Sequence, residues 1–192
     1  MRVCLIHGST QGPHGWDLLA RELMAWGAKV VAVDMPVDRP SEGAEFYANE
    51  VVKQMPAGEA PVVVAHSSAG LILPVVASRI KVSRLIYLAA VIPEPGKVFL
   101  DRVKRTPKMF QPDWPGKDPT KSEELARHFL FHDCDERTAR WAMTTLRLWM
   151  ATGVAKEACP LRQMPAIPTD YISGTLDRAL NPVWWEEAAQ SL

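Results

Sequence analysis

The chain has 192 residues, 47% of them hydrophobic and 23% charged, which is typical of one folded domain and not of a disordered chain. Because 22 Lys and Arg balance 22 Asp and Glu, no net charge favours binding to nucleic acid or to an anionic membrane. No apolar run approaches the roughly 20 residues of a membrane span, and Cys4, Cys134 and Cys159 form no paired motif. We therefore expect a cytoplasmic enzyme or small-molecule binder without a disulfide scaffold, a metal or a cofactor.

Five short runs predict buried parallel strands, because they are apolar throughout instead of alternating. They are Val3–His7, Lys29–Val33, Pro61–Ala65, Arg84–Ala90 and Pro168–Ile172. The first three gaps between them hold helical patterns at Trp16–Trp26, Glu42–Met55 and Ser68–Ile80. Strands that alternate with helices indicate an α/β fold with a doubly wound, mostly parallel sheet.

The spacing of apolar residues predicts the buried side of the first two helices. In Trp16–Trp26 this side carries Leu19, Leu23 and Trp26. In Glu42–Met55 it carries Phe46, Met55 and one of Val51 and Val52.

The fourth gap, residues 93–165, is too long for a single crossover helix. Thr120 and Glu123 have the spacing of a capping box, before a helix with Leu125 and Phe129 on one face. Asp135 is placed to cap a second helix, whose inner side carries Ala139, Met143, Leu146 and Met150. We interpret residues 93–165 as a helical lid inserted before the last strand, over a core made by 1–92 and 166–192. A bulky excursion that faces solvent is the alternative.

The loop after the third strand carries a candidate nucleophile, and ligands of open α/β sheets bind beside such loops. Ser67, in the sequence AHSSAG, stands at a strand-to-helix junction with the small residues Ala65 and Ala69 two positions away. A tight turn of this kind exposes the serine hydroxyl and leaves the amide of Ser68 free to stabilise an oxyanion. A serine that only caps the helix is the alternative.

Two further loops at the same edge of the sheet complete the pattern. The amide of Ser9, after the first strand, would lie beside that of Ser68 as a second oxyanion donor. Its loop, Ser9–Gly12, lacks the lysine of a P-loop, so a flavodoxin-like phosphate site is a weaker alternative. Asp177 follows the last strand, in the nucleophile-then-acid order of α/β-hydrolases, although a surface carboxylate is the alternative.

The chain resembles the small α/β-hydrolases that include the salicylate-binding plant methylesterases and the hydroxynitrile lyases. The resemblance rests on HGSTQGPHGW, VVAVDMP, AHSSAG, FLFHDCD with WAM, and YISGTLDRALNP, and it covers essentially the whole chain. It implies an α/β-hydrolase fold, shortened at both ends, with Ser67 as nucleophile, Asp177 as triad acid, and the backbone amides of Ser9 and Ser68 as oxyanion hole. The lyases carry a threonine at the position of Gly8, so this glycine favours ester hydrolysis.

One departure from the resemblance concerns the catalytic histidine. Relatives carry it in a loop beyond the Asn-Pro helix, and none of the histidines of this sequence occupies that place. They are His7, His14, His66, His128 and His132. We expect His7 to support the loops and His128 and His132 to belong to the lid. Two interpretations stay open: a hydrolase whose sequence is shortened here, or a non-catalytic small-molecule binding protein on a hydrolase fold.

The sequence thus predicts a serine carboxylesterase that acts on a small, largely apolar ester through an acyl-enzyme at Ser67. The expected partners are that ester and a second copy of the chain, because the strand at Pro168–Ile172 would form an uncovered sheet edge. Nucleic acid and membrane are not expected partners. The four adjacent residues His132–Asp135 are too close in sequence to surround one metal ion.

Overall fold

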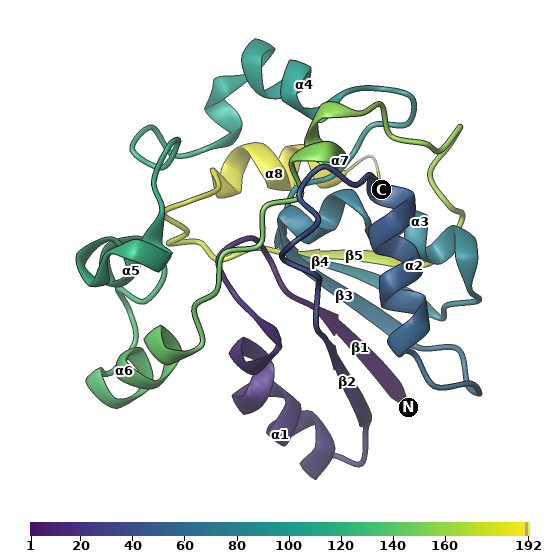
Figure 1. Cartoon of the computed structure of the whole chain (residues 1–192), viewed down its shortest axis with the longest axis horizontal. Coiled ribbons are helices and arrows are strands. Elements are labelled where there is room, and N and C mark those ends of the chain that lie inside the picture. The colour runs from purple at the N-terminus through teal and green to yellow at the C-terminus, as the bar shows by residue number, and fades with distance from the viewer. Residues whose placement is uncertain (191) are drawn as a thin grey trace.

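The computed structural model describes residues 1–190 and 192, and a five-stranded parallel sheet forms its centre (Figure 1). The strands are β1 (Arg2–Ile6), β2 (Lys29–Val33), β3 (Val62–Ser67), β4 (Arg84–Ala90) and β5 (Thr169–Ile172). They are arranged in the order β2-β1-β3-β4-β5, and every neighbouring pair is parallel. The predicted α/β fold with a doubly wound parallel sheet is confirmed.

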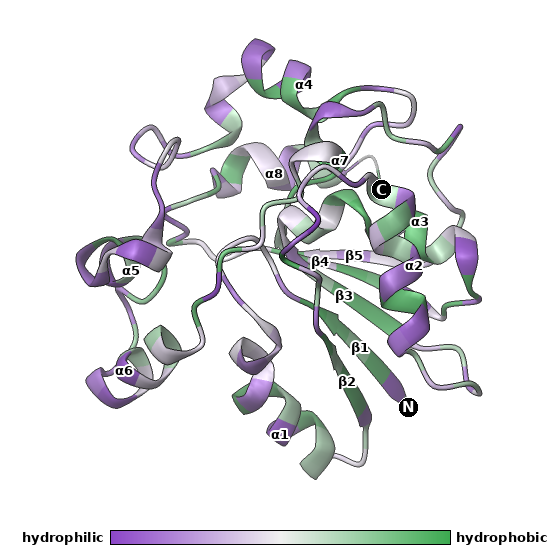
Figure 2. Cartoon of the chain, in the orientation of Figure 1, coloured by the Kyte–Doolittle hydropathy of each residue, from purple (hydrophilic) through white to green (hydrophobic). Residues whose placement is uncertain are grey.

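Helices cover both faces of this sheet. On one face, α1 (Asp17–Ala25) packs Leu23 into a cluster with Leu5 and Val64. On the other, α2 (Ala44–Gln54), α3 (Leu73–Arg79) and α8 (Pro182–Ala189) contribute to a larger core that contains Tyr47 and Trp185. The central strands are apolar along their length because both of their faces are covered (Figure 2).

The buried side of α1 differs from the predicted one. Trp26 is 84% exposed and Leu19 is 40% exposed, so of the predicted side only Leu23 packs on the sheet. Trp26 leaves the helix face because α1 ends at Ala25, and Gly27, with a φ of +82°, turns the chain away from the helix axis. Trp16, which precedes α1 in a 3₁₀ turn (Pro13–Trp16), is buried in this layer instead.

The next two helices follow the prediction more closely. In α2 the buried residues are Ala44, Tyr47, Ala48 and Val51, which decides for Val51 over Val52. The predicted Phe46 and Met55 are only partly buried against the same core. The predicted helix over 68–80 is divided into a 3₁₀ turn (Ser68–Leu71) and α3. Pro74 lies in the first turn of α3, where its missing N–H removes no helical hydrogen bond.

Residues 93–165 contain α4 (Phe99–Arg105), α5 (Glu123–Phe129), α6 (Glu136–Thr144) and α7 (Thr152–Lys156), with 3₁₀ turns at Pro107–Met109 and Pro119–Lys121. The predicted capping box at Thr120 is wrong. The Oγ of Ser122 caps α5 by accepting from the amide of Leu125 at 3.2 Å. Thr120 belongs to the preceding 3₁₀ turn, where its hydroxyl donates to Asp118.

The second helix of this segment is capped as predicted but ends early. Asp135 accepts from the amide of Thr138 at 2.9 Å. Because α6 stops at Thr144, Leu146 and Met150 do not lie on it, and Met150 is 51% exposed. Residues 145–149 instead run beside the loop after β1, through backbone hydrogen bonds that join residues 12 and 145, 147 and 10, and 149 and 9.

The pair α5 and α6 has a small apolar core of its own, made by Ala126, Phe131, Ala139 and Ala142. In the part of the chain that the structure describes, no helix is long and apolar enough to span a lipid bilayer.

Candidate active site

The backbone at Ser67 is strained. Ser67 ends β3 with φ 54° and ψ −125°, in a region that residues with a side chain rarely adopt. The register of β3 against β4 shifts at the same point, between His66 and Ser67. Such a conformation costs about 1–3 kcal/mol and persists where surrounding packing fixes it, often at functional sites.

Two glycines allow this turn to be so closely packed. A Cβ added at Gly70 would lie 2.0 Å from the carbonyl oxygen of Val91, so the backbone after β4 touches the turn directly. A Cβ added at Gly8 would lie 2.7 Å from the Cβ of Ser67. Sequence analysis did not single out Gly70, although its place in AHSSAG was the available signal.

A cavity of about 360 Å³ opens at the serine. Its lining includes Ser67, Asp177, His66, His132 and Trp114. The loops after β3 and β5 therefore meet at one space, which residues of the 93–165 segment close from the other side.

Asp177 is held by the loop that follows β5. Its Oδ1 accepts hydrogen bonds from the amides of Ala179 at 2.7 Å and Leu180 at 2.9 Å. Burial raises the pKa of this carboxyl above its ordinary value, while the two amide donors and the charge of His132 act in the opposite direction. The two amides thus fix the orientation of the carboxyl group. A positive charge in the cavity would stabilise its ionised form.

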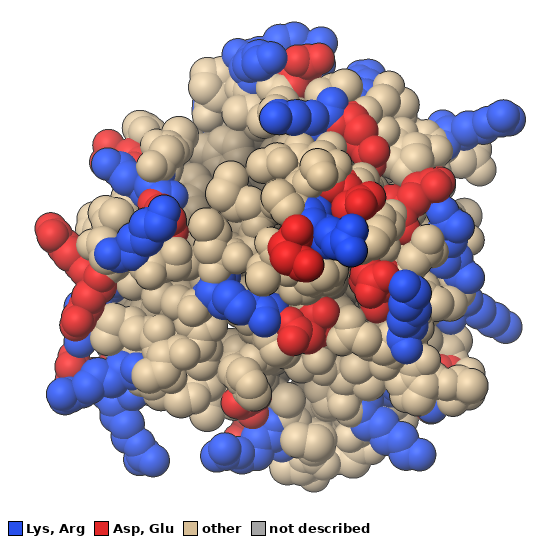
Figure 3. Space-filling view, in the orientation of Figure 1, with Lys and Arg blue, Asp and Glu red and all other residues tan. Residues whose placement is uncertain are grey.

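A second, larger cavity of about 500 Å³ adjoins the first, and Thr10 and Trp114 line both. Ser9 and Ser68 line this larger cavity together with apolar residues of the 93–165 segment, such as Phe99 and Trp149. In Figure 3 the surface next to α4 is hollowed and largely uncharged. The two predicted oxyanion residues and the predicted nucleophile thus face adjoining parts of one site.

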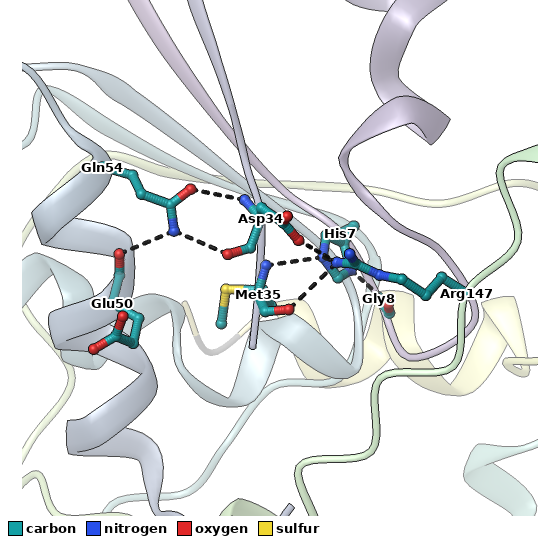
Figure 4. A network of polar contacts seen from close by, with 7 residues as sticks. All are labelled: His7, Gly8, Asp34, Met35, Glu50, Gln54 and Arg147. Atoms are coloured by element: carbon teal, nitrogen blue, oxygen red, sulfur yellow. Dashed lines mark hydrogen bonds and ion pairs between the residues drawn. The ribbon is translucent and has the colours of Figure 1, made fainter. Parts of the chain in front are cut away.

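His7 supports the loop after β1, as predicted (Figure 4). Its ring is fully buried, with Nδ1 3.0 Å from the carbonyl oxygen of Gly8 and Nε2 accepting from the amide of Met35 at 3.3 Å. Burial lowers its pKa to about 4. Arg147, which sequence analysis did not identify, lies 3.4 Å from His7 Nε2 and pairs with the carboxylate of Asp34.

The other histidines occupy distinct places. His14 lies on the surface, 3.4 Å from the carboxylate of Asp17. His128 lies 3.3 Å from a guanidinium nitrogen of Arg178. The ring of His66 packs edge-on against Trp16, and burial lowers its pKa to about 4.

The sequence did not predict that His132 lies at the candidate site. It lies in the 93–165 segment, and the structure brings it to the cavity that Ser67 and Asp177 also line. No local pattern could reveal this, because the position of His132 depends on how α5 and α6 fold back over the sheet.

Comparisons with known proteins agree with the fold. The model of the alpha/beta hydrolase family matches residues 5–192. Polyneuridine aldehyde esterase is a similar solved structure, with a TM-score of 0.77, 19% identity, and coverage of 99% of this chain and 86% of its own. A methylesterase from Arabidopsis gives a TM-score of 0.74 at 18% identity, covering 99% of this chain and 84% of its own.

An extracellular alpha/beta-hydrolase from a Paenibacillus species gives a TM-score of 0.71 at 21% identity, covering 94% of this chain and 80% of its own. At these identities the likeness shows a shared fold. Among curated protein sequences, none matches this chain.

Proposed function

The chain belongs to the alpha/beta hydrolase family, and we propose that within it the protein is a serine carboxylesterase. The observation that carries this proposal is the strained turn at Ser67, which opens on a cavity that Asp177 also lines. In the proposed reaction the Oγ of Ser67 bonds to the ester carbonyl carbon, the alcohol leaves, and water releases the acid from the acyl-enzyme. The amides of Ser9 and Ser68 stabilise the oxyanion, a general base carries the proton of the Ser67 hydroxyl to the alcohol oxygen as it leaves, and the carboxylate of Asp177 orients that base.

The two adjoining cavities support a particular orientation of the substrate. The larger one, which Ser9 and Ser68 line together with many apolar side chains, suits an apolar acyl group. The smaller one, beside Asp177, suits the alcohol and later the attacking water. Residues 93–165 supply much of the apolar lining and serve as the lid in this proposal. Two of the similar structures are an aldehyde esterase and a methylesterase by name, which supports an ester substrate.

Labelling with a fluorophosphonate tests the nucleophile, because this probe reacts only with an activated serine. We expect one label per chain, located at Ser67 by peptide mass spectrometry, and hydrolysis of p-nitrophenyl acetate by the same chain. Ser67→Ala should abolish labelling and lower turnover by roughly 10⁴-fold or more. Ser68→Ala is the matched control, because it removes the neighbouring hydroxyl but keeps the backbone amide.

Turnover by Ser67→Ala at the rate of the unmodified chain would refute the nucleophile. A chain that binds apolar esters, measured by tryptophan fluorescence, but neither labels nor hydrolyses them would be the non-catalytic binding protein instead.

A further inference from the structure

The end of β4 contains a second strained residue beside the candidate nucleophile. Ala89 has a φ of +40°, and Ser67 is the only other described residue with a side chain and a positive φ. Both residues line the cavity of about 360 Å³. A left-handed backbone is unfavourable for any residue with a Cβ, whereas glycine adopts it freely. A strained alanine therefore persists where the surrounding structure requires it, most often at functional sites.

A bulge in β4 accounts for this conformation. The register of the two strands shifts between His66 and Ser67, where Ala89 has no counterpart in β3. Ser67 is instead opposite Ala90. An extra residue of this kind bends its strand and redirects the residues that follow it. The neighbouring strand β5 does not oppose the change, because its pairing with β4 stops at Leu88.

The residue after the bulge holds the turn at Ser67 in place. The amide of Val91 donates to the carbonyl oxygen of Ser67 at 3.1 Å. The carbonyl oxygen of Val91 lies against Gly70, so closely that a Cβ there would collide with it. Gly70 belongs to the 3₁₀ turn that follows Ser67. The backbone of one buried residue therefore contacts the strained turn at both of its ends.

We propose that Ala89 is a positioning residue for the nucleophile. Its left-handed conformation creates the bulge, and the bulge brings the backbone of Val91 to Ser67. This contact keeps Ser67 in the conformation in which it lines the cavity. The consequence for catalysis rests on the proposed esterase function. A misplacement of about 1 Å is enough to slow a reaction by about 10²-fold.

The backbone at position 89 restricts which side chains it can carry. A β-branched residue such as valine is strongly disfavoured at positive φ, whereas asparagine tolerates the left-handed region. The asparagine side chain is longer than that of valine, so it takes at least as much room in the cavity. The two substitutions therefore separate the effect of the backbone conformation from the effect of filling the cavity.

The test compares Ala89→Val with Ala89→Asn and Ala89→Gly in the full chain. The readouts are the rate of fluorophosphonate labelling at Ser67 and the hydrogen exchange of the Val91 amide, measured by NMR. We expect Ala89→Val to label roughly 10²-fold more slowly than Ala89→Asn, and its Val91 amide to exchange roughly tenfold faster. Ala89→Gly should resemble Ala89→Asn. The amide of Leu85, which donates to Pro168 at the other end of β4, is the control and should exchange equally in all three.

Thermal unfolding gives a second measure that does not depend on a folded valine variant. Ala90→Gly, at a neighbour with ordinary backbone, should lower the melting temperature by about 2–4 °C. Ala89→Gly should not lower it, because glycine relieves the strain. Equal losses in the two glycine variants would contradict the left-handed conformation and overturn the proposal.

Two further outcomes would overturn the proposal. One is the same labelling rate and the same Val91 exchange in all three variants at position 89. The other is equally slow labelling of Ala89→Val and Ala89→Asn with unchanged Val91 exchange, because position 89 would then only limit the space in the cavity. If the unmodified chain does not label at Ser67, the esterase proposal fails, and Val91 exchange still decides whether Ala89 holds the turn.

Discussion

The packing around Ser67 is so close that position 8 can hold only a glycine without movement of the turn. The Cα of Gly8 lies so close to the turn at Ser67 that any side chain would meet the Cβ of Ser67 and the ring of His66. The backbone at Ser67 is already strained, so it cannot easily give way. The hydroxynitrile lyases that the sequence resembles carry a threonine at this position. In this protein a threonine side chain would not fit there unless the turn moved.

Replacing Gly8 by Ala should therefore damage both stability and the site. The added Cβ would lie 2.7 Å from the Cβ of Ser67, so we expect a loss of about 1–3 kcal/mol in the free energy of unfolding. Labelling of Ser67 should slow, because the hydroxyl is displaced. Urea unfolding and the labelling rate measure the two effects.

Gly15→Ala is the control, since the atoms nearest to its Cβ would be those of the Gln11 side chain, at ordinary distances of 3.5–3.7 Å. Equal stability of the two alanine variants would contradict the close packing at Gly8.

At the scale of elements, residues 145–149 join the 93–165 segment to the loop after β1. Their backbone hydrogen bonds hold the loop that carries Ser9, and Arg147 extends from them to the end of β2. There the guanidinium reaches the carboxylate of Asp34, the carbonyl of Met35 and the ring of His7 (Figure 4). The side-chain amide of Gln54, on α2, holds Asp34 in turn: it accepts from the backbone N–H of Asp34 and donates to the backbone C=O of Asp34.

Arg147→Ala should loosen this junction. We expect a loss of about 1–2 kcal/mol in the free energy of unfolding, mostly from lost packing and hydrogen bonds, because an ion pair this exposed contributes little by itself. Urea unfolding provides the measurement.

Arg140→Ala, which removes an exposed ion pair with Glu136 on α6, should cause no measurable change. If the two variants lose the same stability, Arg147 is only a surface residue.

At the scale of the whole molecule, two buried histidines make the free energy of unfolding depend on pH. Burial lowers the pKa of His7 and His66 to about 4, whereas an unfolded histidine titrates near 6.5. Above pH 6.5 neither state binds a proton at these rings, and the full stability is present. Between pH 6.5 and 4 the unfolded chain binds protons that the folded chain does not, so stability falls as the pH is lowered. Asp177, whose pKa is raised by burial, acts in the opposite sense.

We therefore predict a lower free energy of unfolding at pH 5 than at pH 7, by about 2–3 kcal/mol, because two histidines outweigh one carboxyl group. Urea unfolding at the two pH values measures this difference. His14→Gln should leave it unchanged, because the side chain of His14 is 80% exposed. A free energy of unfolding that is the same at pH 7 and pH 5 would contradict neutral, buried rings at His7 and His66.

The sequence by itself determined the sheet, the turn at Ser67 and the place of Asp177. Each depends on local properties: continuous apolar runs form buried parallel strands, and small residues around a serine permit a tight turn. The ends of parallel strands lie at one edge, which is why the loops after β3 and β5 share a cavity.

Only the tertiary structure decided the places of Trp26, Met150, Arg147 and His132. Helical periodicity placed Trp26 and Met150 on buried helix faces, but α1 ends at Ala25 and α6 at Thr144. The chain beyond α6 gains backbone hydrogen bonds to the loop after β1 in place of another helical turn. His132 lines the same cavity as Ser67 because it lies between α5 and α6, which pack on one another. Contacts between residues far apart in sequence outweigh local preference at these positions, and no local pattern encodes them.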